Sequence, residues 1–278
     1  MQSPINKLAD ELIVMIMEYF DNDKELFRQY PIDGNPDYAT TLHSCALTQR
    51  RWTRLAQQVL HRTVHIHPDN LERQCHHYGP SSESGNNPYT AGLGLFPREL
   101  YIASMNMSRS ERWQSLYTFA AYCGDRITRF DATNIAFGSF NNFLNLFGYF
   151  PHLKHLALED CSWGADDMKL WHDCTDFGTC QCAAPSAPAS LRHVYVRLLE
   201  GTTPLPIAQW LMHSRTNEIE ELTWAFKFSL FDDTASSTSG ALRLLGTSLT
   251  EVVLDVDVSE AWDDGEWPGV MNLKYDYA

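Results

Sequence analysis

The sequence predicts an α/β protein in which N-terminal helices precede strand–helix units that stack into an irregular solenoid with a curved parallel sheet. Three observations predict this fold. Apolar residues recur at helical spacing within the first 60 positions. A short strand-like pattern then occurs five times, and helix-like segments separate its copies, as parallel strands require.

The first element is expected to be a helix that ends near residues 21–23. Asp10 and Glu11 lie in its first turn, where acidic side chains suit the positive end of the helix dipole. One apolar stripe is formed by Leu8, Leu12, Ile13, Ile16, Met17 and Phe20.

A second helix is expected within residues 42–60. Its basic residues Arg50, Arg51 and Arg54 lie on the polar side. The apolar side is formed by Leu42, Cys45, Ala46, Trp52, Leu55, Val59 and Leu60. Because two helices of this size bury little surface, they must pack against the rest of the chain or against a partner.

Together these segments resemble an F-box, a helical module that binds an adaptor protein. The resemblance rests on Leu8-x-x-Glu11-Leu12, Ile16, Tyr19-Phe20, Leu47-x-x-Arg50-Arg51-Trp52-x-x-Leu55 and Leu60-x-Arg62. The continuation into Thr63-Val64 is similar to fungal F-box proteins. The chain departs from the family pattern at Ala9, where proline is usual, at Cys45, and in an apparent inserted loop over residues 27–41.

The F-box resemblance implies that the chain is the substrate-recognition subunit of a cullin–RING ubiquitin ligase. Such a subunit has no chemistry or cofactor of its own. It joins a Skp-type adaptor, and through it the cullin complex, to a protein substrate. The positions that match the family's adaptor-binding or module-core residues are Leu8, Leu12, Ile16, Leu47, Trp52 and Leu55.

The recurring strand pattern reads apolar-x-x-apolar-x-apolar. It begins at Ile127, Leu153, Leu191, Ile219 and Leu249, with successive spacings of 26, 38, 28 and 30 residues. A further strand is expected at residues 97–102. The copy from Leu153 to Cys161 most resembles a leucine-rich repeat, with Cys161 at the position usually taken by Asn or Cys.

Helices are expected at residues 113–122, 140–147, 205–212 and 241–245, between the strands. The predicted organisation is therefore an F-box-like module over 1–67, a polar loop over 68–96 and a leucine-rich-repeat-like domain over 97–278. An ordinary α/β domain would show the same alternation, so it remains an alternative fold. In either fold, residues between the apolar strand positions face outward, and Arg192, His193 and Tyr195 are the predicted substrate contacts.

Metal and catalytic chemistry have little support in the sequence. His172, Cys174, Cys180 and Cys182 are zinc-ligand types, but they lack the usual Cys-x-x-Cys spacing and run into an Ala-Pro-rich stretch, so a loop with free thiols is favoured. No nucleophile elbow, phosphate-binding loop or zinc-protease motif occurs. We therefore expect no metal and no enzyme activity, with an interaction scaffold or an unrecognised α/β enzyme as alternative functions.

Composition indicates an intracellular protein of the cytosol or nucleus. The net charge of -14 disfavours a nucleic-acid surface, and no apolar run is long enough to span a membrane. Seven cysteines without a regular framework favour reduced thiols.

Overall fold

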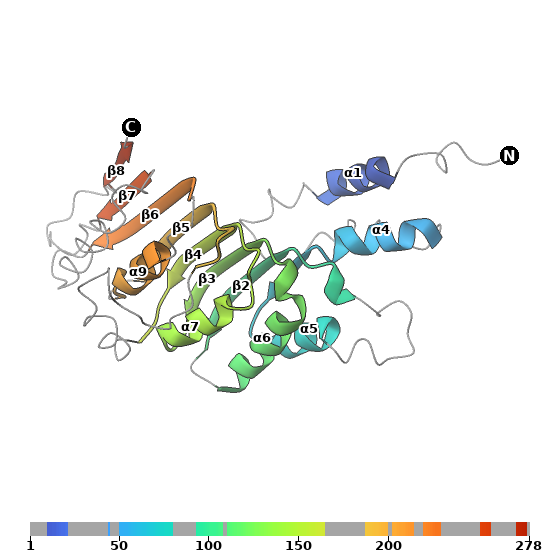
Figure 1. The fold of residues 1–278 in the computed structure, drawn as a ribbon, viewed down its shortest axis with the longest axis horizontal. Helices are drawn as coiled ribbons and strands as arrows, with labels where there is room; N and C mark the ends of the chain where they lie inside the picture. Colours follow the sequence, from blue (N-terminus) through green and yellow to red (C-terminus); the bar gives the residue numbers. More distant parts are fainter. Residues whose placement is uncertain are drawn as a thin grey trace, which may run out of the picture.

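The computed structural model describes residues 10–21, 44, 50–79, 93–107, 110–164, 187–199, 202–213, 219–228, 251–256 and 271–276. The described chain is an α/β fold with one eight-stranded sheet, in which strand order follows chain order (Figure 1). The strands are β1 (Thr63–Ile66), β2 (Glu99–Asn106), β3 (Arg129–Ala136), β4 (His155–Cys161), β5 (His193–Leu198), β6 (Glu221–Phe228), β7 (Glu251–Val256) and β8 (Met271–Asp276).

Six consecutive pairings, from β1–β2 to β6–β7, are parallel, whereas β7 and β8 pair antiparallel. Residues at equivalent positions of neighbouring parallel strands pair with each other along most of the sheet. Leu100 lies opposite Phe130, Phe130 opposite Leu156, and Leu156 opposite Val194. Equivalent residues of successive units therefore form straight rows across the strands.

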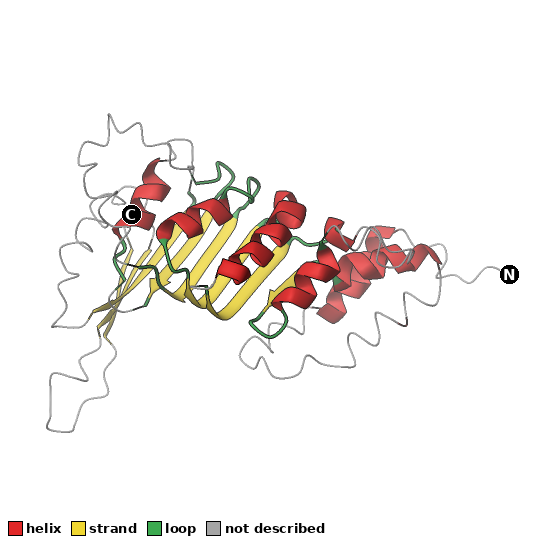
Figure 2. Ribbon diagram, turned by 90° about the horizontal axis from the view of Figure 1, so that it is seen from below, coloured by secondary structure: helices red, strands yellow, loops and turns green. Residues whose placement is uncertain are grey.

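Helices between the strands cover one face of the sheet (Figure 2). They are α5 (Leu71–Tyr78), α6 (Ser110–Cys123), α7 (Phe140–Phe147) and α9 (Leu205–His213), with short 3-10 turns η3 (Leu93–Leu95) and η4 (Gly124–Arg126). Two more helices, α1 (Asp10–Asp21) and α4 (Arg50–Leu60), lie beyond the β1 end of the sheet (Figure 1).

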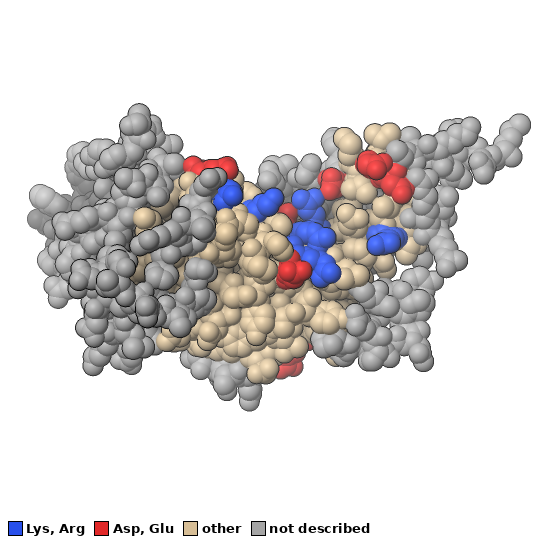
Figure 3. Space-filling model, viewed as in Figure 1, with Lys and Arg blue, Asp and Glu red and all other residues tan. Residues whose placement is uncertain are grey.

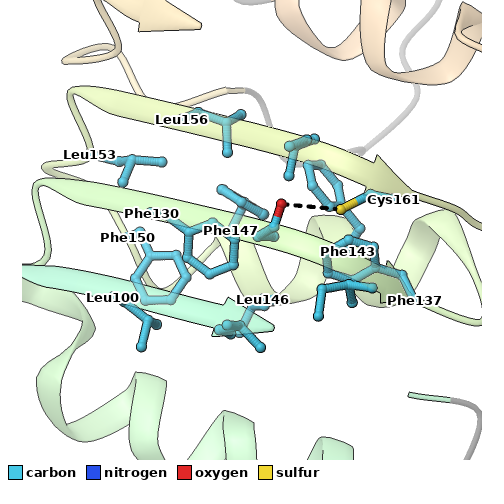
Figure 4. Close-up of a cluster of buried hydrophobic side chains, with 14 of the residues drawn as sticks. Leu100, Phe130, Phe137, Phe143, Leu146, Phe147, Phe150, Leu153, Leu156 and Cys161 are labelled. Atoms are coloured by element: carbon cyan, nitrogen blue, oxygen red, sulfur yellow. Dashed lines mark hydrogen bonds between the residues drawn. The ribbon is translucent and has the colours of Figure 1, made fainter. Parts of the chain in front are cut away.

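The main core lies between the sheet and these helices because alternate strand residues point towards them. In β3, for example, Phe130 and Ala132 are buried while Arg129 and Asp131 are half-buried on the outer face. Aromatic side chains from β3, α7 and the following turn fill this space (Figure 4). Phe143 of α7 contacts Trp210 of α9 with ring centroids 5.3 Å apart, so the helical layer is itself continuous.

Local sequence explains where α7 begins. The hydroxyl of Ser139 accepts a hydrogen bond from the backbone N–H of Asn142 at 3.1 Å, which satisfies one of the free donors of the first turn. Within the helix, Phe140, Phe143, Leu144 and Phe147 recur at spacings of three and four and are all buried.

The structure confirms the α/β class and the parallel alternation of strands and helices. The five recurring patterns form β3 to β7, and the strand expected at 97–102 forms β2. The expected helices at 113–122, 140–147 and 205–212 correspond to α6, α7 and α9. The helix expected at 241–245 lies outside the described residues.

The polar loop expected over 68–96 needs correction. Within this range, α5 is a helix whose Leu71, Cys75 and Tyr78 are buried in the main core. These three residues recur at positions i, i+4 and i+7, and their burial stabilises a helix despite the polar residues between them. Strand β1, which falls within the expected N-terminal module, belongs to the large sheet through its pairing with β2.

Candidate interaction surfaces

The helices α1 and α4 form a hairpin-like pair with a small core of their own. Ile13, Ala56 and Val59 are its buried members, and Val14, Trp52, Leu55 and Leu60 pack against them. This cluster is separate from the main core beneath the sheet. The N-terminal helices therefore pack chiefly against each other, as a small module beside the sheet.

One apolar side of α1 is left in solvent. Leu12, Met15 and Ile16 are 47%, 62% and 50% exposed, respectively. Their spacing of i, i+3 and i+4 places them on one face of the helix, which we call the α1 apolar face. Three large apolar side chains in one small area mark a surface suited to a partner.

Arg62 connects the α1–α4 pair to the sheet through two ion pairs. Its guanidinium lies 2.8 Å from the Glu18 carboxylate of α1 and 3.3 Å from the Glu99 carboxylate of β2. Because these groups are partly exposed, each ion pair contributes little stability alone. The two pairs nevertheless orient α1 relative to the first strands.

The residues expected to bind an adaptor fall into three groups. Leu12 and Ile16 lie on the α1 apolar face, whereas Trp52 and Leu55 pack into the small core of the hairpin. Leu8 and Leu47 lie outside the described residues. Met15 was not among the predicted adaptor contacts, although its position three residues after Leu12 was a usable signal.

A second surface is the outer face of the sheet, opposite the helices. In-register rows bring together His65, Tyr101, Asp131, Ala157, Tyr195 and Thr223 in one line across the strands. A neighbouring row contains Thr63, Glu99, Arg129, His155, His193 and Glu221. The outer face thus combines aromatic rings with charges of both signs.

The charges within this face largely neutralise each other. Arg129 bonds to Asp131 of its own strand at 2.9 Å. Arg197 of β5 reaches two carboxylates of β4, Glu159 at 2.8 Å and Asp160 at 2.9 Å. These pairs hold adjacent strand residues in fixed positions and leave little net charge at the centre of the face.

Histidine and tyrosine rings are ordered on the outer face by stacking. His65 stacks on Tyr101 with ring centroids 5.0 Å apart, and His155 stacks on His193 at 4.4 Å. Burial lowers the pKa of His155 below its ordinary value, and the adjacent His193, Arg129 and Lys154 lower it further, with Asp131 opposing them. His155 therefore favours its neutral form.

The three predicted substrate contacts are only partly brought together. His193 and Tyr195 both lie on the outer face, and His193 lies 3.2 Å from the Glu221 carboxylate. Arg192 comes just before β5, at the N-terminal end of this inner strand, where its side chain lies 3.6 Å from the Glu220 carboxylate. Two of the three residues therefore lie on the outer face of the sheet, and Arg192 lies at the start of the strand.

The described cysteines are structural rather than reactive. Cys75, Cys123 and Cys161 are buried free thiols. Burial raises the pKa of Cys161 to about 12, and its Sγ donates a weak hydrogen bond to the Ala132 carbonyl at 3.5 Å (Figure 4). A neutral buried thiol is a poor nucleophile and metal ligand.

Within the described ranges, no three His, Cys, Asp or Glu side chains are placed to hold a metal ion. The cluster of His172, Cys174, Cys180 and Cys182 lies outside those ranges. No helix in the described part of the chain has the length and apolar character needed to cross a membrane.

Comparison with protein-family models, curated proteins and solved structures finds no match for this chain.

Proposed function

We propose that the chain is a substrate-recognition subunit of a cullin–RING ubiquitin ligase, with α1 and α4 binding a Skp-type adaptor and the sheet binding a protein substrate. The observation that carries the proposal is the exposure of Leu12, Met15 and Ile16. A helix that only capped the sheet would hide its apolar stripe, whereas an F-box must leave apolar side chains for its adaptor.

Within the helix pair, the residues that form the core differ from those that face solvent, and this supports the proposed role. Ile13 packs against Ala56 and Val59, so the helix pair has a core that does not use the α1 apolar face. Leu12 and Ile16 occupy positions that match adaptor contacts in the resemblance to F-box proteins, and they are the ones left exposed. Burying each against a partner would contribute roughly 1.5–3 kcal/mol before ordering costs are subtracted.

The sheet would act as the substrate-binding part. Its units follow one another in chain order, and each pairs with its neighbours, which suits an irregular leucine-rich-repeat-like solenoid. Such a subunit needs no catalytic group, because it acts by raising the effective concentration of substrate near the conjugating enzyme.

The test is a binding titration of the intact protein with a purified Skp-type adaptor. We expect the double variant Leu12→Asp, Ile16→Asp to lose binding by at least roughly a hundredfold, because two charges would replace the apolar contacts. The matched control is Leu95→Asp, Leu199→Asp, since both leucines are 47% exposed and neither belongs to α1 or α4. Circular dichroism checks that both variants remain folded.

Absence of binding by the intact protein at micromolar concentrations would rule out the adaptor role. Equal loss in both double variants would also contradict it, because the α1 apolar face would then have no special part. The remaining candidate would be an interaction scaffold whose sheet binds partners without an adaptor.

A further inference from the structure

A line of basic side chains marks the start of successive strands. Residues 62, 98, 128, 154 and 192 each precede a strand and are joined by backbone hydrogen bonds of 2.8–2.9 Å from one to the next. Four of these five positions hold Arg62, Arg98, Lys154 and Arg192. The remaining position is Thr128, and Arg126 lies two residues before it. We call these five cations the basic edge. Lys and Arg side chains gather in a band across the middle of Figure 3.

The three central cations of the basic edge form no ion pair with a described carboxylate, although Asp125 is the chain neighbour of Arg126 and lies 3.7 Å from His152. Among the described residues, no Asp or Glu forms an ion pair with Arg98, Arg126 or Lys154. Arg98 instead donates to the Leu95 and Pro97 carbonyls. Burial lowers the pKa of Arg98, and the positive charges of Arg126 and Arg62 lower it further.

Both ends of the basic edge are closed by acidic side chains. Arg62 is paired with Glu18 and Glu99, and Arg192 with Glu220. The cations without an ion pair to a described carboxylate therefore lie at the starts of β2, β3 and β4. This location matters because the chain as a whole carries a net charge of -14, so the basic edge is a local exception.

From this arrangement we infer that the basic edge binds a short acidic segment of a partner protein, lying in extended form across the strand starts. Adjacent strands are about 4.8 Å apart, so the four intervals from Arg62 to Arg192 span about 19 Å. An extended peptide advances about 3.3 Å per residue, and about six residues would cover that span. The segment would belong to the substrate in the proposed function.

The spread of the cations favours several carboxylates over one phosphate. A phosphate is held by donors that converge on one point, often with backbone N–H groups. Here the backbone N–H groups of Arg98, Lys154 and Arg192 already donate to the carbonyl of the residue that comes just before the neighbouring strand. Charges distributed along a line match charges distributed along a peptide.

The closed ends also favour a short peptide over a nucleic acid. A duplex would continue past Arg62 and Arg192 with its dense negative charge. It would then meet Glu18 at one end and Glu220 at the other, which repel it.

The test is fluorescence anisotropy of the intact protein without any adaptor. The probe is a labelled peptide of six consecutive Asp and Glu residues flanked by Gly and Ser, and its comparison peptide carries Asn and Gln instead. We expect the acidic peptide alone to bind, and to bind more weakly as salt rises from about 50 mM to about 500 mM. The variant Arg126→Gln, Lys154→Gln should weaken binding roughly five- to thirtyfold.

The matched control is Arg73→Gln, Arg112→Gln, which makes the same change in net charge on α5 and α6. It should bind the acidic peptide like the wild type. The inference is overturned if the intact protein does not bind the acidic peptide, or if both double variants weaken binding equally. It is also overturned if a peptide whose only charged side chain is one phosphoserine, or a short DNA duplex, binds more tightly than the acidic peptide.

This result is independent of the adaptor titration. Loss of adaptor binding with retained peptide binding would remove the proposed ligase role and leave the basic edge in place. The opposite result would leave the ligase role and remove only the acidic substrate segment.

Discussion

His155 of β4 and His193 of β5 lie face to face on the outer face of the sheet, with ring centroids 4.4 Å apart and planes inclined by 4°. Their strands are in register at this position. Protonation of His155 would place a positive charge against the His193 ring and beside Arg129 and Lys154. The stack therefore links the protonation of His155 to the stability of the sheet.

Acidification should weaken the fold in part through His155. The pKa of His155 is lowered below 6.5 in the folded protein, first by burial and then by His193, Arg129 and Lys154, against Asp131. The unfolded chain consequently binds more protons than the folded one as pH falls through 6.5, so stability falls with it. We expect the drop in melting temperature between about pH 7.5 and pH 5.5 to be smaller in His155→Gln than in the wild type.

The control for the pH prediction is Ala157→Ser, a substitution on β4 that removes no titratable group. It should keep the wild-type dependence on pH. An unchanged dependence in His155→Gln would contradict the contribution of His155 to the stability change in this range.

Ile13 and Leu12 are neighbours on α1, but Ile13 is buried and Leu12 is exposed. Substituting each by alanine should therefore change the stability of the α1–α4 pair by different amounts. Ile13→Ala would leave a cavity in the small core and destabilise the α1–α4 pair by about 2–4 kcal/mol. Leu12→Ala should change stability by less than about 0.5 kcal/mol, because Leu12 is in solvent. Hydrogen exchange of the α1 amides measures the difference, and equal exchange in the two variants would contradict it.

Asn134 has a left-handed backbone conformation with φ of 55°, and Ser104 and Asp160 have similar values at equivalent positions of β2 and β4. A β-branched side chain is strained there, so Asn134→Val should cost about 1–2 kcal/mol. Asn134→Gly should stay within about 0.5 kcal/mol of the wild type. Urea unfolding measures both, with Thr133→Val as the neighbouring control that should be tolerated.

Phe143 is the centre of the aromatic core. Its ring contacts Phe137, Phe140, Phe147, Trp163 and Trp210. Phe143→Ala should reduce the free energy of unfolding by about 3–5 kcal/mol, and Phe143→Leu by clearly less, because leucine refills part of the cavity. Asn141→Ala, on the exposed side of the same helix, should have little effect. Chemical denaturation would contradict the prediction if the two phenylalanine variants were equally stable.

The sheet was predictable because its strands are covered on one side only. Apolar residues such as Leu156 and Leu158 then alternate with polar ones, and this period of two is visible in the sequence. Strand β8 carried the same signal at Met271, Leu273 and Tyr275, but its antiparallel pairing with β7 depends on which strand lies next to it in space. Periodicity alone does not contain that information.

Two features could not be predicted from the sequence: the burial of α5 and the exposure of the α1 apolar face. The polar composition around Leu71 and Tyr78 obscured three buried positions, because burial depends on the neighbouring α6. On α1, Leu12, Ile13 and Ile16 are equally apolar, so the sequence predicted one stripe for all of them. Only the position of α4 decides that Ile13 is buried and that Leu12 and Ile16 are exposed.

The identity of strand order and chain order has a consequence for synthesis of the protein. Each strand from β2 to β8 pairs with the strand that left the ribosome just before it. Apart from β1, which pairs with the later β2, no described strand must wait for a later segment before its first partner exists. The sheet can therefore lengthen strand by strand during translation, and the edge that awaits pairing is always the most recently made one.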